Sequence, residues 1–234
     1  MNADLLFAGG IEILLLLLAV SAHESAHAWV ADRCGDPTAR SLGRVSLNPV
    51  RHLDLFGSLI LPLLQAAFRE PVFGWARPTP VVPQNLRNPY RDSLLIAAAG
   101  PVANGLLAAL ATIGVGIVVQ GLGGEERRAA AQTVLQSLLP LLKDDISALT
   151  DFPVMFTLVR MATINAFLVV FNLLPLPPLD GGQIVVQLLP PDWGAKLAGL
   201  RPYGLIIGMI LGLLLVKFLL LPFYILLSMV IQIF

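Results

Sequence analysis

The sequence predicts an α-helical polytopic membrane protein, and two observations carry this prediction. The first is composition: of 234 residues, 56% are hydrophobic and only 13% are charged, and the mean hydropathy is +0.80. The second is a set of apolar stretches long enough to cross a bilayer, which takes about 20 helical residues. We therefore expect about four to six transmembrane helices within a single domain that covers residues 1–234.

Four stretches have the length and apolarity of a transmembrane helix: about 6–31, 93–122, 153–174 and 203–221, the last extended by apolar residues to Phe234. Whether 203–234 forms one broken span or two stays open, and with it the side of the C-terminus. The apolar stretch 55–68 is shorter and contains Gly57 and Pro62. These features favour a re-entrant or interfacial segment over a crossing helix.

Arginine residues support that interpretation and orient the chain. They flank the short apolar stretch on both sides: Arg33, Arg40, Arg44 and Arg51 before it, and Arg69, Arg77, Arg87 and Arg91 after it. The positive-inside rule places both flanks in the cytoplasm, so the first span runs from outside to inside. The loop 123–152 holds more acidic than basic residues, which suits the outer face, and we expect its residues 135–142 on the membrane surface.

The sequence argues against nucleic-acid binding, an internal disulfide and a cleaved signal peptide. The net charge is zero and no basic stripe is present, so nucleic acid is not an expected partner. Cys34 is the single cysteine, which leaves no internal disulfide. The apolar N-terminal run lacks a basic start, so we expect no cleaved signal peptide. Gly, Pro and Asn punctuate the segments on either side of 55–68, which predicts loops with short strands.

The pentapeptide His23-Glu24-Ser25-Ala26-His27 lies inside the first apolar span. Ionisable groups at bilayer depth are costly, so a functional role is the default expectation. On a helix, positions i and i+4 share one face, and both imidazoles can therefore reach one metal ion. Glu24 lies beside the pair, where a zinc site with an open position needs a carboxylate to take a proton from water.

A third metal ligand must come from another part of the chain. The candidates are His52, Asp32, Asp36, Asp54 and Asp180. Asp180 stands out because it follows three prolines and precedes Gly181 and Gly182, which break the third span beside the acid. Irregular backbone at membrane depth is tolerated only where it lines a cavity or is buried in protein. The alternative is a helix terminator with a solvated aspartate.

Four motifs together resemble the site-2 protease family of intramembrane zinc metalloproteases. They are HESAH, then GDPTARSLGRVSLNPVRHLD, then AAAGPVANG, and finally NLLPLPPLDGG. The resemblance covers about residues 20–190 and is nearest to compact prokaryotic members that lack PDZ and CBS domains. It implies a catalytic core at about 6–190, followed by a C-terminal membrane segment at 203–234.

The resemblance also implies roles for single residues. His23, His27 and Asp180 match the ligands of one Zn²⁺ per chain, and Glu24 matches the general base and acid. Asn172 matches an asparagine near the metal that could polarise the scissile carbonyl or hold an extended substrate.

Asn104 and His52 are two further positions of this pattern, each with a structural alternative. Asn104 matches a second asparagine, a candidate for substrate binding, and interhelical hydrogen bonding is the alternative for Asn104 and Asn172 alike. His52 could act catalytically on an oxyanion or could hold the re-entrant loop in place. Strands within 38–50 and 71–82 could pair with substrate by edge addition.

The implied activity is hydrolysis of peptide bonds within or near transmembrane segments of membrane-protein substrates. We expect a multi-pass protein of a prokaryotic plasma membrane, with its active site nearer the cytoplasmic face. The rival interpretations are a metal-binding membrane transporter, which would carry polar residues along a path through the bilayer, and a catalytically silent scaffold, which would have lost a ligand. Glu12 and Arg160 are expected to reach outward to the interface. The sequence does not predict the substrate, the oligomeric state or a role for Lys217.

Overall fold

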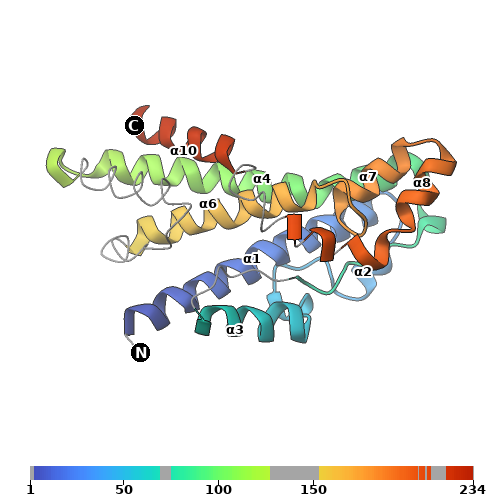
Figure 1. Ribbon diagram of the computed structural model, residues 1–234, viewed down its shortest axis with the longest axis horizontal. Helices are drawn as coiled ribbons and strands as arrows, with labels where there is room; N and C mark the ends of the chain where they lie inside the picture. Colours follow the sequence, from blue (N-terminus) through green and yellow to red (C-terminus); the bar gives the residue numbers. More distant parts are fainter. Residues whose placement is uncertain are drawn as a thin grey trace.

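The protein is built from long helices that run side by side (Figure 1). The computed structural model describes residues 3–68, 75–126, 153–204, 206–208, 210–211 and 220–233. Three helices form the centre: α1 (Ala3–Arg33), α4 (Pro89–Gly121) and α6 (Pro153–Asn172). Each contains a stretch long and apolar enough to cross a membrane. The mostly helical class and three of the expected spans are thereby confirmed.

Shorter elements surround the three long helices. In chain order they are α2 (Thr38–Ser41), η1 (Pro49–Arg51), the π-helical turn η2 (Leu55–Ile60), α3 (Leu61–Phe68), η3 (Pro83–Asn85), α7 (Asp180–Leu188), α8 (Pro191–Ala198) and α10 (Leu221–Ile233). Most of the expected span at 203–221, including Lys217, lies outside the described residues, as does the segment 135–142. The number of further spans therefore stays a prediction.

Prolines and side-chain caps set the beginning of α4. The helix starts at Pro89, where the missing N–H costs no helical hydrogen bond, and the side chain of Asn88 accepts a bond from the Arg91 N–H at 3.1 Å. The helix after α6 begins differently, because Asp180 follows an irregular turn at 173–179. This turn is the break that the proline-rich sequence predicts.

An apolar cluster packs the half of the bundle that lies away from α7. It contains Val115, Val119, Met155, Phe156, Val159 and Leu227, contributed by α4, α6 and α10. Large apolar side chains also point outward from α4, among them Leu106, Leu110 and Ile117, each about 60% exposed. Outward-facing apolar residues of this kind are expected for a helix that contacts lipid.

The region that we expected to hold a re-entrant segment is helical. The π-helical turn η2 leads directly into α3, and the exposed side chains of Leu55, Phe56, Leu63 and Phe68 are apolar. An apolar exposed surface on a short helix suits an element embedded in lipid without crossing it. The re-entrant path itself stays a prediction.

The expected substrate-pairing strands are not found in the residues that the structure describes. Within 38–50 the chain forms α2 and turns, and 75–82 has no strand partner, while 71–74 lies outside the described residues. Pro78 and Pro80 offer one reason, since each lacks the N–H that a regular ladder needs. The stretch 75–82 is held instead by single hydrogen bonds to the rest of the protein.

Glu12 and Arg160 do not reach outward separately as expected. They form an ion pair with each other, between α1 and α6, and the Arg160 guanidinium also lies 5.9 Å from the ring centre of Phe156. A charge that is shielded from water is stabilised by a close opposite charge. A charge that reaches the membrane interface is stabilised by water instead. The pair satisfies both charges within the bundle.

Candidate metal centre

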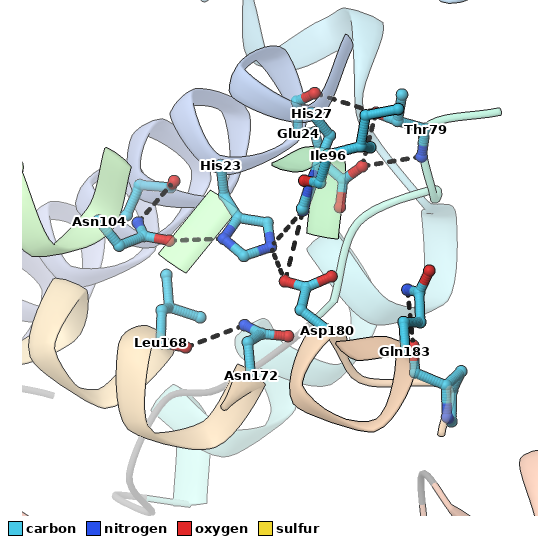
Figure 2. Close-up of polar contacts among 12 residues, drawn as sticks. His23, Glu24, His27, Thr79, Ile96, Asn104, Leu168, Asn172, Asp180 and Gln183 are labelled. Atoms are coloured by element: carbon cyan, nitrogen blue, oxygen red, sulfur yellow. Dashed lines mark hydrogen bonds and ion pairs between the residues drawn. The ribbon is translucent and has the colours of Figure 1, made fainter. Parts of the chain in front are cut away.

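Three buried side chains converge between α1 and the start of α7 (Figure 2). The Nε2 atoms of His23 and His27 lie 3.0 Å apart, and Asp180 Oδ2 lies 3.1 Å from the first and 3.4 Å from the second. The exposed fraction of each residue is only 6–7%. The two histidines face the same way because they are separated by four helical residues. The chain therefore brings together the two histidines and the aspartate that the sequence analysis singled out.

Two glycines allow Asp180 to reach the histidines. After α6 the chain turns back, so that the first turn of α7 lies directly against the backbone of 173–177. A Cβ atom on Gly181 would stand 2.3 Å from the Leu173 carbonyl oxygen, and one on Gly182 would stand 2.2 Å from the carbonyl carbon of Leu176. Both distances are far below van der Waals contact. The two glycines are thus required by the close approach of this turn.

Hydrogen bonds on the far side of each imidazole fix which nitrogen faces Asp180. His27 Nδ1 lies 2.6 Å from the Ile96 carbonyl oxygen, and His23 Nδ1 lies 2.6 Å from Asn104 Oδ1. Carbonyl and amide oxygens only accept hydrogen bonds, so both Nδ1 atoms carry the hydrogen. In a neutral imidazole the Nε2 atom then presents a lone pair. This arrangement, with the outer nitrogen bonded to an acceptor, is the usual one for a metal-ligating histidine.

The arrangement fits a divalent cation. Two nitrogen lone pairs and a carboxylate oxygen at these distances repel one another, and Asp180 Oδ2 is buried with no hydrogen-bond partner. A tetrahedral zinc ion with bonds of about 2.0–2.1 Å separates its ligand atoms by about 3.3 Å, close to the spacing observed. Among the described residues, no other group of three acidic, histidine or cysteine side chains converges in this way.

Gly100 of α4 leaves open the space in front of the two histidines. A Cβ atom at this position would stand 2.4 Å from His27 Nε2 and 2.6 Å from His23 Nε2. Any side chain there would collide with the atoms that face Asp180. The absence of a side chain at position 100 is therefore part of the site.

Glu24 is held by the segment that precedes η3. Its Oε2 atom accepts the backbone N–H of Thr79 at 2.8 Å and the Thr79 hydroxyl at 2.7 Å. The other carboxylate oxygen, Oε1, is free of this contact (Figure 2). A carboxylate beside a cation, with one oxygen anchored and one available, is the arrangement that a general base requires.

Comparisons with known proteins agree with this geometry. The model of peptidase family M50 matches residues 11–215. The chain belongs to peptidase family M50. It is 36% identical, over 85% of its length and 78% of the relative's, to the "Putative zinc metalloprotease YwhC" of Bacillus subtilis (strain 168). It is 27% identical, over 86% of its length and 67% of the relative's, to the "Putative zinc metalloprotease Rip2" of Mycolicibacterium smegmatis. No solved structure matches the chain.

Family M50 is the site-2 protease family, as the motifs of the sequence indicated. The protein is therefore an intramembrane zinc metalloprotease. The three long apolar helices make it a membrane protein, in keeping with the family. The convergent donor set supplies the place where Zn²⁺ could bind.

The remaining metal-ligand candidates of the M50 protease lie away from the convergent group. Asp32 pairs with Arg40 at 2.8 Å, and Asp54 accepts the N–H of Gly57 at 2.7 Å as a helix cap. Asp36 accepts hydrogen bonds from the loop, including the Val82 N–H at 2.7 Å. Each of these aspartates already has a structural partner.

His52 also lies apart from the convergent group. It is 2% exposed, its Nε2 donates to the Ser46 carbonyl at 2.7 Å, and its own carbonyl accepts the Arg77 N–H at 2.9 Å. Its Nδ1 atom is buried with no hydrogen-bond partner among the described residues. These contacts join the loop after α2 to the stretch 75–82.

The two asparagines have different neighbours around the site (Figure 2). Asn104 bonds directly to His23 Nδ1. Asn172 ends α6, lies beside Asp180 in Figure 2, and donates one N–H to the Leu168 carbonyl of its own helix at 3.0 Å. Asn104 is thus turned toward a histidine, in the interhelical arrangement that was the alternative to substrate binding.

A buried cation lies near the protease's Glu24. Arg44 is 6% exposed, and its Nη1 donates to the Arg77 carbonyl at 3.3 Å. Burial lowers the pKa of the Arg44 guanidinium and Arg77 lowers it further, whereas Glu24 raises it. Because an arginine stays charged in proteins, Arg44 contributes positive potential at the carboxylate.

Sequence reasoning missed three residues of the site: Thr79, Gly100 as a direct neighbour of the histidines, and Asn165, which bonds to Asn104. Gly100 belongs to the AAAGPVANG motif, but the motif itself does not indicate that this glycine faces the two histidines. Thr79 lies between two prolines in a loop, where no periodic pattern marks a site. Asn165 did carry a signal, because a lone amide in an apolar span needs a partner.

Proposed function

We propose that His23, His27 and Asp180 hold the zinc ion of this protease and that Glu24 is its general base and acid. The observation that carries the proposal is the convergence of two Nε2 lone pairs and an unpartnered carboxylate oxygen within 3.4 Å of one another. Zinc bound there supplies Lewis-acid chemistry, which polarises a carbonyl and makes water more acidic.

Glu24 performs the proton transfers of the reaction. Thr79 anchors Oε2, so Oε1 takes a proton from water as water attacks the scissile carbonyl. The same oxygen then delivers that proton to the departing amine nitrogen, which restores the carboxylate. The positive charge of Arg44 interacts favourably with the Glu24 carboxylate.

Asn172 and His52 have supporting roles in this proposal. The Asn172 amide keeps a second N–H after bonding to Leu168, and we assign it to the carbonyl of an extended substrate beside Asp180. His52 holds the loop and the stretch 75–82 together through its bonds to Ser46 and Arg77. Asn104 acts on His23 and does not contact substrate.

The substrate in this proposal is a transmembrane segment of another membrane protein. A helix hides its carbonyl groups within its own hydrogen bonds, so it must unwind before water can attack, and helix-breaking residues in the substrate make unwinding easier. We place the protein in a bacterial cell membrane with the site near the cytoplasmic face. Exposed arginines gather at that end: Arg33, Arg40, Arg51, Arg77, Arg87 and Arg91.

The test measures zinc content and cleavage of a single-span substrate in detergent, for the wild type, Glu24→Gln and Asp180→Ala. We expect one zinc per chain in the wild type and in Glu24→Gln, with cleavage about 10²- to 10⁴-fold slower in Glu24→Gln. Asp180→Ala should lose zinc. Normal zinc content in Asp180→Ala would move the third ligand to another residue, and an active Glu24→Gln variant would refute the role of Glu24.

A further inference from the structure

We propose that Asn165 is a positioning residue of the zinc site, which acts through Asn104 to determine which nitrogen of His23 faces the ion. The inference rests on the proposed function, since it takes His23 to be a ligand. Asn165 comes from the middle of α6, a helix that provides none of the proposed zinc ligands. Its connection to the site is a chain of hydrogen bonds that crosses the bundle.

The chain links all three long helices. Asn165 Nδ2 donates to the Met161 carbonyl at 2.8 Å, and Asn165 Oδ1 accepts from Asn104 Nδ2 at 2.7 Å. Asn104 Oδ1 then accepts from His23 Nδ1 at 2.6 Å. Asn104 is 0% exposed and Asn165 is 1% exposed, so water does not compete for these bonds. A polar chain in such surroundings is held in one arrangement because each alternative leaves a buried group unpaired.

Backbone carbonyls fix the direction of every bond in this chain. The Met161 carbonyl can only accept, so the Asn165 atom that faces it must be the amide nitrogen, and Asn165 then presents its oxygen to Asn104. Asn104 meets that oxygen with its nitrogen, which also donates to the Ala19 carbonyl at 3.2 Å. The oxygen of Asn104 is thereby turned toward His23, which must carry its hydrogen on Nδ1.

Asn165 supplies the stronger of the two anchors of Asn104. Without it, the amide nitrogen of Asn104 keeps only the longer bond to Ala19, and a buried N–H is left without a partner. Rotation of the Asn104 amide then becomes less costly, and a rotated amide would donate to His23 Nδ1. That would place the histidine hydrogen on Nε2, the atom that faces Asp180, and the ring could not bind a metal.

The first test compares zinc affinity, measured by competition with a chelator in detergent, for the wild type, Asn165→Leu and Asn165→Asp. Asn165→Leu should bind zinc about three- to tenfold more weakly, the effect of one lost hydrogen bond. Asn165→Asp should retain the wild-type affinity, because a buried carboxyl stays protonated and offers the same donor and acceptor. Equal affinity of wild type and Asn165→Leu, or equal weakening by both variants, would overturn the proposal.

Thr112→Val is the matched control. Thr112 is 2% exposed on α4, and within the described residues its hydroxyl bonds to the Ala108 carbonyl of its own helix, so removal of this buried hydroxyl should leave zinc affinity unchanged. Loss of zinc affinity in the control would show that any buried polar deletion disturbs the site, and would overturn the specific role of Asn165.

A double-mutant cycle separates positioning from general stabilisation. Since Asn165 acts through Asn104, adding Asn165→Leu to Asn104→Leu should lower zinc affinity no further, whereas additive losses would overturn the proposed route. The ¹⁵N resonances of His23 in metal-free protein provide a spectroscopic check: the wild type and Asn165→Asp should show the Nδ1–H tautomer, and Asn165→Leu a mixture. A wild type that binds no zinc would instead refute the proposed ligands, so the two failures are distinguishable.

Discussion

The two halves of the helical bundle bury polar groups in opposite ways. In the half near α7, the side chains of His23, His27 and Asp180 direct two Nε2 atoms and a carboxylate oxygen at one another. In the other half, Glu12 and Arg160 neutralise each other beside an apolar cluster of α4, α6 and α10. In the first half three side chains gather atoms that could bind a cation, whereas in the second the two opposite charges compensate each other and only the Arg160 Nε atom lacks a hydrogen-bond partner among the described residues of the pair.

This difference teaches how a buried polar group can be assigned to function or to structure. A buried ion pair whose two charges compensate each other can stabilise the fold or add specificity. It carries a desolvation cost that a pair of apolar residues would not have. Several buried nitrogen and carboxylate oxygen atoms that converge on one point are candidates for binding a cation. Four changes to the chain can break or sharpen this comparison.

Gly100→Ala should have the largest effect, because it fills the space in front of the two histidines. The added Cβ would lie 2.4 Å from His27 Nε2, so we expect zinc affinity to fall at least 100-fold and cleavage to be lost. Alanine favours the helix by about 1 kcal/mol, so the metal-free protein should not unfold. Zinc content and helicity of the purified variant check this.

Gly105→Ala is the control for that experiment. Gly105 lies on the same helix, and a Cβ there meets only Val169 Cγ2, at 3.9 Å. Zinc content and activity should match the wild type. If both alanine variants lose zinc equally, the effect belongs to the helix and not to the space at position 100.

Glu12→Leu tests the other half of the comparison. The substitution leaves the partly buried Arg160 guanidinium without its counter-charge, which should cost about 2 kcal/mol of unfolding free energy, less than for a fully buried pair. Denaturant unfolding in micelles measures this, and zinc stoichiometry should stay at one per chain.

The double variant Glu12→Leu with Arg160→Leu should recover most of that loss, because two apolar residues replace the pair. We expect this recovery because Glu12 and Arg160 compensate each other's charge. A double variant as unstable as Glu12→Leu would show that the pair contributes net stability. Loss of zinc in either variant would mean that the two halves are coupled.

The sequence predicted the convergence of His23, His27 and Asp180 because their pattern is local or conspicuous. The His-Glu-x-x-His spacing alone places two imidazoles on one helical face, and a proline-rich break before an Asp-Gly-Gly sequence marks Asp180 as the candidate third ligand. The transmembrane class followed from hydropathy, which needs no knowledge of contacts.

The contacts between distant segments could not be predicted in the same way. Arg160 was expected to reach water, yet its partner Glu12 lies on another helix, and only the packing of α1 on α6 brings the charges together. Thr79 reaches Glu24 from a loop 55 residues away. The prolines beside Thr79 favour an extended backbone, but they do not indicate which residue accepts a hydrogen bond from the Thr79 N–H.

Thr79→Val sharpens the comparison within the site half, since it removes one of two donors to Glu24 without touching a metal ligand. We expect kcat to fall about tenfold, the effect of one hydrogen bond to a charged group, with unchanged zinc content. Thr79→Ser keeps the hydroxyl and should restore activity. Steady-state kinetics decide the matter: a change confined to KM would assign Thr79 to substrate binding.

The smallest effect is expected from Asp36→Asn, at the loop that carries Thr79. The Asp36 carboxylate accepts the Val82 N–H at 2.7 Å and the Asn85 amide at 2.9 Å, and so holds this segment to the end of α1. Burial raises the pKa of the Asp36 carboxyl, but the hydrogen bonds it accepts outweigh burial and bring the pKa below its usual value.

The sign of the pH dependence follows from that lowered pKa. A folded-state pKa below the unfolded one means that Asp36 stabilises the fold above pH about 4, and that this stability is lost as pH falls through the folded pKa. Asp36→Asn should cost about 1–2 kcal/mol at pH 7 and flatten the pH dependence of the unfolding midpoint on the acid side of about pH 4. Asp32→Asn is the control, because its exposed pair with Arg40 should contribute less than about 1 kcal/mol. Equal pH profiles for wild type and Asp36→Asn would show that the loop is held to α1 by packing, and that Glu24 owes its anchor to apolar contacts.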